Sequence, residues 1–407
     1  NRYNYFLDKR VQILAKDARQ YLKQVSKNYD VILCGLPSAP TLMHNRFYST
    51  EFFKLCRSRL TPNGIYSFSL PYSESYTGPE LTQLNKQIGK TFQAVFPKLL
   101  IWPGTANHFI GFANENTPLS YNSWSLVSRM NELGIRNSYF TPQAIVNLLT
   151  REKADKVQVL LAPNSLPINT DLRPHAYFYH QILWLSYLRS SLKYFYSKAT
   201  PLITYGFFAF IFCLILYLKL AARNTLNIPT TIFSLGSGAM ILQIANIFLF
   251  QVLVGSLYYQ IGILILLFML GLFLGSYQSN KEFLIAKILK KNLPLKAALL
   301  LIPAAALLTL TIGAFTLLPT VAYLLLFPLL SLLIGYPIGR IYGLGVQRQE
   351  KFTAQPGFLA ALIYSADIWG GAFMALLTTT IVLPTVGFLG TICIAIGFIF
   401  LAMLKTK

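Results

Sequence analysis

The stretch YDVILCGLPSAPTLMHNRFYST, residues 29–50, decides how the first half of this chain is organised. The run from Val31 to Leu33 is apolar and rich in β-branched side chains, which is typical of a buried strand. Gly35 and the prolines that follow end this run, and a helical pattern begins near Ser49. In an open α/β sheet, ligands bind in the loop after the carboxyl end of a strand. The loop that begins at Gly35 is therefore the first candidate for a site.

Strands and helices alternate on both sides of this stretch. The hydrophobic pattern predicts further strands at residues 10–15, 65–70, 99–102 and 106–112, and helices at residues 19–26, 50–60 and 80–96. Thr61-Pro62-Asn63-Gly64 has the composition of a turn in which Gly64 takes a positive φ. The alternation favours an α/β fold built on a doubly wound sheet.

The composition changes near residue 200. With 54% hydrophobic and 12% charged residues, the 407-residue chain is too apolar for one soluble protein. Seven apolar runs of membrane-spanning length follow, at 202–220, 230–254, 257–277, 295–316, 320–340, 358–382 and 386–405. We therefore predict an α/β domain over residues 1–168, an interfacial connector over 169–200 and a transmembrane domain over 201–407.

The net charge of +21 raises the question of an anionic partner. The sequence contains no basic-aromatic reader motif, which argues against nucleic acid and favours the lipid bilayer. Every Lys and Arg beyond residue 200 lies at the end of the first, third or fifth run, between that run and the next, at the start of the fourth run, or in the tail: Lys219, Arg223, Lys281, Lys287, Lys290, Lys291, Lys296, Arg340, Arg348, Lys351, Lys405 and Lys407. The positive-inside rule places these loops in the cytoplasm of a bacterial inner membrane and the soluble domain outside. Arg189, Lys193 and Lys198, before the first run, oppose that orientation.

Several motifs resemble one protein family. KDARQYL at 16–22 resembles the G-D-A-R-x-(Y/F)-L segment of the spermidine synthases (polyamine aminopropyltransferases), and residues 29–50 resemble the segment that carries their catalytic aspartate. NRFYS at 45–49 and INTDLRPHAYFY at 168–179 resemble motifs of the membrane-embedded branch of that family. FQVLVGSLYYQIG and YSADIWGG, in the apolar half, are similar to two motifs of the same branch.

The resemblance implies a partial methyltransferase-type Rossmann domain. It implies aminopropyl transfer from decarboxylated S-adenosylmethionine to a polyamine or related small amine. Asp17, Ala18 and Gly35 are then candidates for binding that co-substrate, although Asp17 could instead be an ordinary helix N-cap. No G-x-G-x-x-G turn is present, so we expect it upstream of Asn1, in a longer protein. An upstream segment or a second copy of the chain would complete the sheet.

The catalytic loop departs from the family. The family pattern Y-D-x-I-x-x-D-x-x-D-P places Gly35 and Ser38 at its two later aspartates and Ala39 at its proline. In the family, the second of these aspartates is thought to accept a proton from the attacking amine, and a serine is too weakly basic for that role. Tyr48 is a candidate wall of the site, or a packed aromatic. Whether the chain is an active enzyme is open.

Polar residues within the apolar runs are a second group of candidates. Asp367 is the only carboxylate inside a predicted span, which makes it a functional candidate. Gln243, Asn246 and Gln251 lie on the second span, where their spacing puts them on roughly one face of a helix. Contacts between helices are the alternative role for the two glutamines. Asp171 and Arg173 are close enough in sequence to pair with each other. The four cysteines form no C-x-x-C or Cys/His cluster, so we expect no metal.

Three functions are compatible with these patterns. The first is a membrane-anchored aminopropyltransferase. The second is a non-catalytic relative that keeps the fold for binding or as a scaffold. The third is a transporter of polyamines or other small molecules that uses Asp367 and the polar face of the second span.

Overall fold

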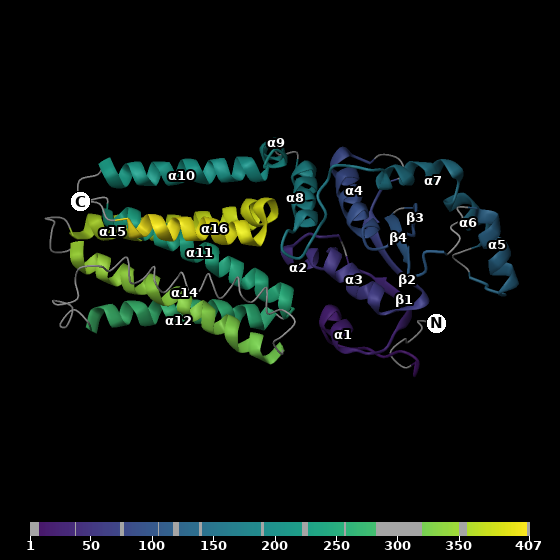
Figure 1. Cartoon of the computed structure of the whole chain (residues 1–407), viewed down its shortest axis with the longest axis horizontal. Helices are drawn as coiled ribbons and strands as arrows, with labels where there is room; N and C mark the ends of the chain where they lie inside the picture. Colours follow the sequence, from purple (N-terminus) through teal and green to yellow (C-terminus); the bar gives the residue numbers. More distant parts are fainter. Residues whose placement is uncertain are drawn as a thin grey trace.

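A computed structural model describes residues 8–36, 38–73, 77–104, 106–116, 122–137, 141–188, 191–221, 227–255, 258–281, 320–349 and 356–404. Figure 1 shows an α/β part at one end of a bundle of long helices, with α8 (His175–Tyr187) and α9 (Leu192–Ser197) between them. The α/β part contains α1 (Ala18–Gln24), β1 (Tyr29–Cys34), α2 (Leu42–Asn45), α3 (Thr50–Ser58), β2 (Leu60–Pro71), α4 (Pro79–Gln93), β3 (Leu99–Trp102), β4 (Ala106–Phe112), α5 (Ser123–Glu132), α6 (Pro142–Leu148) and α7 (Arg151–Gln158).

The described strands form one mixed sheet in the order β1-β2-β4-β3. β1 and β2 are parallel, as expected for strands joined through a helix, while β2, β4 and β3 pair in antiparallel fashion. The core lies between this sheet and helices α3 and α4, where the rings of Phe53, Tyr66, Phe68 and Phe92 contact one another. The α/β fold expected from the alternating pattern is therefore confirmed in its later strands.

Two local predictions were wrong. Residues 10–15 form no strand, because no strand of the described part pairs with them, and Ile13 is 63% exposed. Residues 61–64 do not form a separate turn, because β2 begins at Leu60 and runs through them. Gly64 is absent from the glycines of positive φ. A Cβ on Gly64 would lie 2.9 Å from the carbonyl oxygen of Tyr29, so close approach of β1 explains the glycine.

The opposite face of the sheet is less covered at β1. Val31 and Leu33 are 50% and 73% exposed, although their positions predict a buried strand. Among the described strands β1 pairs on one side only, with β2. β1 is therefore an edge strand with an apolar face in contact with solvent in this part of the chain.

The helical half contains α10 (Pro201–Ala221), α11 (Asn227–Leu253), α12 (Tyr258–Lys281), α14 (Thr320–Gln349), α15 (Pro356–Leu377) and α16 (Leu383–Met403). Five helical segments of the described chain are long and apolar enough to cross a membrane: 201–220, 228–253, 259–279, 322–345 and 361–403. The predicted run 295–316 lies outside the described residues. The expectation of seven spans is thus matched in part, by five apolar segments.

The fifth segment contains two of the predicted runs. Its 43 residues would extend about 64 Å as one straight helix, roughly twice the apolar thickness of a bilayer. A π-helical turn at Thr378–Val382 interrupts it between α15 and α16, and Gly387, with φ of 74°, kinks it within the first turns of α16. A positive φ is a conformation that glycine adopts without steric cost, which explains the residue at this bend.

Helix α11 is the centre of the bundle and packs against α14, α15 and α16. Its apolar window is 78% buried, whereas that of α10 is 17% buried. Small residues bring the helices together. A Cβ on Gly370 of α15 would lie 2.7 Å from the carbonyl oxygen of Phe233 on α11. Glycines also line the contact of α12 with α14, where a Cβ on Gly275 would overlap the carbonyl of Tyr336.

Candidate functional site

The loop after β1 turns toward the helical bundle. Gly35 is exposed, and a Cβ placed on it would meet nothing within 4 Å. Ser38 is 3% exposed and Ala39 is fully buried. Further along, Leu42 packs against the hydrophobic core of the helical half. The loop of the predicted catalytic site therefore lies at the junction of the two halves, with Ser38 inside the protein.

Tyr48 supports this loop from within. Its side chain is fully buried, its hydroxyl donates a 2.8 Å hydrogen bond to the carbonyl oxygen of Leu36, and its ring contacts Phe68. Burial raises the pKa of Tyr48, so the phenol stays protonated near neutral pH. The structure thus places Tyr48 as a packed aromatic that holds the loop.

Asp17 lies at the N-terminus of α1, directly before the exposed Ala18. One of its oxygens accepts a 3.0 Å hydrogen bond from the backbone N–H of Gln20, which is the geometry of an N-cap. The other oxygen forms an ion pair with Arg46. Both carboxylate oxygens are therefore engaged within the protein.

Arg46 and Gln20 attach this part of the chain to the end of α11. The Arg46 guanidinium is 2% exposed and donates a 3.0 Å hydrogen bond from Nη1 to the carbonyl oxygen of Gln251. Gln20 Nε2 donates a 2.6 Å hydrogen bond to the carbonyl oxygen of Leu253. The last carbonyls of a helix lack partners within the helix and carry partial negative charge. Arg46 and Gln20 therefore cap the C-terminus of α11.

The segment Asn45–Ser49 packs against the segment Asn169–Asp171. Asn169 Nδ2 donates a 2.9 Å hydrogen bond to the carbonyl oxygen of Tyr48, and Asn45 Oδ1 accepts one of 3.2 Å from the N–H of Tyr177. Ser49 Oγ donates a 2.6 Å hydrogen bond to Asp171. The two motifs that resemble the membrane-embedded branch thus form one hydrogen-bonded unit.

Asp171 forms a buried ion pair with Arg19 through both of its oxygens. The two side chains are 8% and 3% exposed. The expected pairing of Asp171 with Arg173 was wrong, because Arg19, from a helix more than 150 residues earlier, takes the carboxylate. Arg173 instead lies beside the kink within α16, where a Cβ on Gly387 would be 2.8 Å from its Cγ.

The charges around this pair influence their neighbours. Glu51 Oε2 accepts a 3.0 Å hydrogen bond from the backbone N–H of Asp171. Loss of water around Glu51 and, next, the charge of Asp171 raise the pKa of Glu51. Burial and then the charge of Arg19 lower the pKa of Lys23 to about 8. Glu51, the first carboxylate after Ser38 in the sequence, is therefore part of this network.

Two histidines of α8 lie beside the same junction. Burial and then the charge of Arg173 lower the pKa of His175 to about 4. Burial and then His44 lower the pKa of His180 to about 4. Within the described chain, the buried Nδ1 of His180 has no hydrogen-bond partner. Both imidazoles are therefore neutral in the folded protein near neutral pH.

The membrane candidates lie in two separate places along α11. Gln243 and Asn246 each donate a hydrogen bond to the hydroxyl of Ser331 on α14, at 3.2 and 2.9 Å. Asp367 lies against Gly236, nearer the other end of α11, where a Cβ would be 3.1 Å from its Oδ1. The polar contact between helices that the sequence left open for Gln243 is therefore present. Gln251 contributes its backbone carbonyl, to Arg46.

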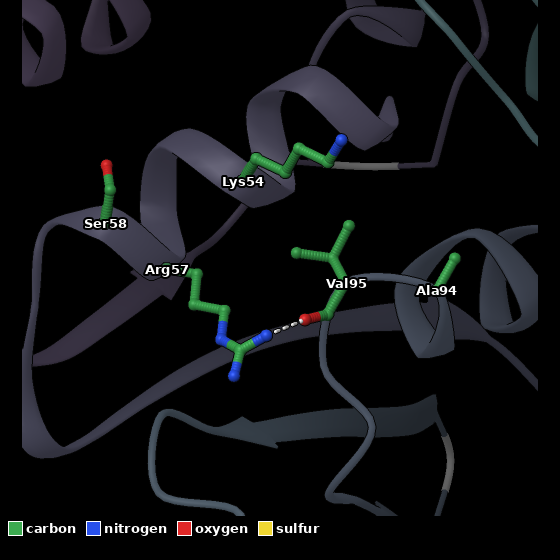
Figure 2. Close-up of a pocket in the computed structure, with 5 residues that line it drawn as sticks. All are labelled: Lys54, Arg57, Ser58, Ala94 and Val95. Atoms are coloured by element: carbon green, nitrogen blue, oxygen red, sulfur yellow. Dashed lines mark hydrogen bonds between the residues drawn. The ribbon is translucent and has the colours of Figure 1, made fainter.

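The surface hollow in Figure 2 lies away from these groups. It encloses about 300 Å³ and is lined by Lys54, Arg57, Ser58, Ala94 and Val95. Arg57 donates hydrogen bonds to the carbonyl oxygen of Val95 and to Glu115, both at 2.7 Å. The hollow is at the C-terminal end of α3, whereas the loop of Ser38 precedes its N-terminal end. No group of three or more potential metal ligands occurs among the residues that the structure describes.

Sequence reasoning missed the roles of Arg19 and Arg46. Both arginines lie in motifs that resemble the family, yet the residues next to them in the sequence do not distinguish them from solvent-exposed cations. Their partners are 152 and 205 residues away in the chain. The one signal in the sequence that these segments meet was that motifs at 16–22, 45–49 and 168–179, far apart in the chain, all resemble the same family.

Comparison with known proteins agrees with the motifs. Residues 1–123 match the family model described as "Spermine/spermidine synthase domain". A polyamine aminopropyltransferase of Oceanobacillus iheyensis is 26% identical over 196 residues, covering 44% of this chain and 33% of the relative. A polyamine aminopropyltransferase of Nitrosomonas europaea is 26% identical over 172 residues, covering 40% of this chain and 50% of the relative. One of Prochlorococcus marinus is 28% identical over 126 residues, covering 30% of this chain and 44% of the relative. The chain spans a third to a half of the length of these relatives. By these matches residues 1–123 are similar to a spermine/spermidine synthase domain, and this part of the chain is spermidine synthase-like.

Proposed function

We propose that this chain is a membrane-anchored, spermidine synthase-like protein whose own aminopropyl transfer is weak or absent. The family match and the α/β fold support the chemistry class, with a polyamine or related small amine as the substrate. The observation that carries the second half of the proposal is the loop after β1. It holds Gly35 and Ser38 where the family has aspartates, and Ser38 is buried.

The described residues do not fit decarboxylated S-adenosylmethionine in the way that the family motif implies. Asp17 would have to contact the adenine side of that co-substrate. Its two oxygens are instead engaged by the N–H of Gln20 and by Arg46. A ligand hydroxyl or amino group would have to displace one of these partners, and one of them belongs to a largely buried ion pair.

The missing base sets the expected rate. A protonated amine must lose a proton before it can attack carbon, and a positioned base typically contributes on the order of 10²–10⁴-fold. Ser38 offers neither charge nor basicity. Glu51 is held by the backbone of Asp171, and Glu74 lies outside the described residues. We therefore expect little or no turnover.

The test is to restore the carboxylates in the full-length protein. Gly35→Asp has open space for its side chain, whereas Ser38→Asp places a carboxylate in a buried position. The two variants and their combination are assayed for transfer to putrescine, with Ser125→Asp on the exposed face of α5 as a control of equal charge. Activity in the restored protein alone supports an intact scaffold that lacks its base. Robust activity of the unmodified chain overturns the proposal.

A specific observation favours the second candidate, a non-catalytic relative. The ion pair of Asp17 with Arg46 joins the co-substrate motif to α11. If the restored variants stay inactive, this scaffold reading is preferred. The third candidate, a transporter that uses Asp367, is tested by uptake of labelled putrescine into vesicles that contain the full chain.

We further propose seven spans with the soluble domain outside the cytoplasm. In Figure 1 the α/β part lies at the end of the bundle from which α10 starts, and the C-terminus at the other. The basic ends of α10 and α12 lie at the same end of the bundle as the C-terminus of the chain. A single thiol at Ser125→Cys, in a chain without other reactive cysteines, should react with an impermeant reagent in intact cells. Protection of this exposed position would reverse the orientation.

A further inference from the structure

The surface of α8 and α9 combines exposed aromatic and aliphatic side chains at the junction with the bundle. Trp184, Tyr187 and Leu188 at the end of α8 are 54%, 61% and 71% exposed. Tyr194 and Phe195 of α9 are 59% and 72% exposed. α8 and α9 pack against each other, so these exposed side chains lie in one region of the surface. Exposed apolar patches mark surfaces that contact another molecule or a membrane.

The place of this surface identifies the partner. α9 ends at Ser197, and the outward-facing α10 starts at Pro201. In Figure 1 α8 runs across the end of the bundle, and α9 lies at the start of α10. The patch therefore adjoins the exposed apolar start of α10, at the level where a spanning helix would leave the bilayer.

The residue types match the chemistry of that level. Tyr and Trp rings are enriched where the acyl chains meet the headgroups, because each ring has an apolar body and a polar edge. The exposed Lys198 lies over the ring of Tyr194, with its Nζ 4.1 Å from the ring centre. An ammonium at this position can contact lipid phosphate while its carbon stem covers the ring.

We propose that the patch formed by Trp184, Tyr187, Leu188, Tyr194, Phe195 and Lys198 lies in the phospholipid headgroup layer and binds it. The inference rests on the proposed membrane anchoring. It adds that the α/β part is held at the bilayer surface by a second contact, outside the spans.

The chain contains its own depth markers, because three of its tryptophans are more than half exposed. Trp124 on α5 is 68% exposed, Trp184 is 54% exposed and Trp369 on α15 is 66% exposed. Three variants are prepared in the full chain, each keeping one of these residues and carrying Phe at the other tryptophans. Each is reconstituted into phosphatidylcholine–phosphatidylglycerol vesicles whose lipids carry bromine near the headgroup or near the chain end.

We expect roughly a twofold or larger loss of Trp184 emission with bromine near the headgroup, because interfacial rings lie at that depth. Trp369 should respond more to bromine deep in the bilayer, and Trp124 only to aqueous acrylamide. Quenching of Trp184 by acrylamide as strong as that of Trp124, without an effect of brominated lipid, overturns the inference. Failure of Trp369 to respond to either lipid would instead contradict membrane anchoring itself.

Discussion

Arg46 Nη1 lies 3.0 Å from the carbonyl oxygen of Gln251, so a side chain of the synthase-like domain caps a helix of the bundle. The same guanidinium forms the ion pair with Asp17. Gly255, just beyond α11, has a φ of 96°, and a Cβ there would lie 3.0 Å from the Asp17 carboxyl carbon. One arginine thus links the N-terminus of α1, the segment that follows α2 and the C-terminus of α11.

Replacement of Arg46 should loosen this joint. In Arg46→Met we expect a loss of roughly 3 kcal/mol in the free energy of unfolding, because a largely buried carboxylate loses its partner. Thermal unfolding of the full chain in detergent measures this loss, with reaction of the buried Cys56 thiol as the signal in a chain without Cys34, Cys213 and Cys393. Arg129→Met, from the exposed pair with Glu132, should leave the midpoint unchanged. Equal midpoints for the two variants would show that the joint contributes nothing.

The Arg19–Asp171 pair permits a double replacement. Asp171→Asn should destabilise the protein by about 3 kcal/mol, because it leaves the buried Arg19 charge uncompensated. Arg19→Met combined with Asp171→Leu should recover much of that loss, since an apolar pair carries no desolvation cost. A double variant less stable than Asp171→Asn would indicate that the hydrogen bond from Ser49 to Asp171 contributes more to stability than the desolvation of the ion pair costs.

Acid should weaken the junction through its histidines. The pKa values of His175 and His180 are about 4 in the folded protein against 6.5 as the ordinary value, so the unfolded chain binds protons first. Their stabilising contribution is complete above pH 6.5 and is lost as the pH falls toward 4. Unfolding midpoints measured across this interval should fall less steeply in His180→Phe. An unchanged slope in that variant would rule out His180 as a cause.

The contact between α12 and α14 depends on glycine at particular positions. In Gly275→Ala we expect a loss of about 1–3 kcal/mol or more, because the new Cβ overlaps the backbone of Tyr336. Gly262→Ala, on the same helix, meets nothing within 4 Å and should be neutral or slightly stabilising. Unfolding midpoints in detergent compare the two, and a larger loss at Gly262 would contradict this packing.

The sequence allowed prediction where the signal was local. The apolar patterns of 65–70, 99–102 and 106–112 predicted strands that the structure contains. The segment 10–15 also has a strand-like apolar pattern, yet a strand needs a partner, and the pattern of one segment does not report one. The turn-like composition predicted a positive φ for Gly64, but the close approach of the neighbouring strand β1 is what requires glycine there.

The site was predictable only in outline. Family motifs indicated Asp17, the loop of Ser38 and the 168–179 segment, and the structure brings these close to one junction. The partners of Asp17 and Asp171 could not be predicted, because an ion pair between residues far apart in the chain leaves no periodic trace. Burial of Ser38 was likewise invisible, since a polar residue in a loop is most often exposed.

The most direct measurement is the rate at which the unmodified full-length protein, reconstituted in lipid vesicles, converts putrescine and decarboxylated S-adenosylmethionine into spermidine. We expect a rate within error of that of protein-free vesicles, because no base stands at Gly35 or Ser38 and Asp17 is held by Arg46. Sustained product formation that scales with protein concentration would contradict this proposal and identify the chain as an active aminopropyltransferase.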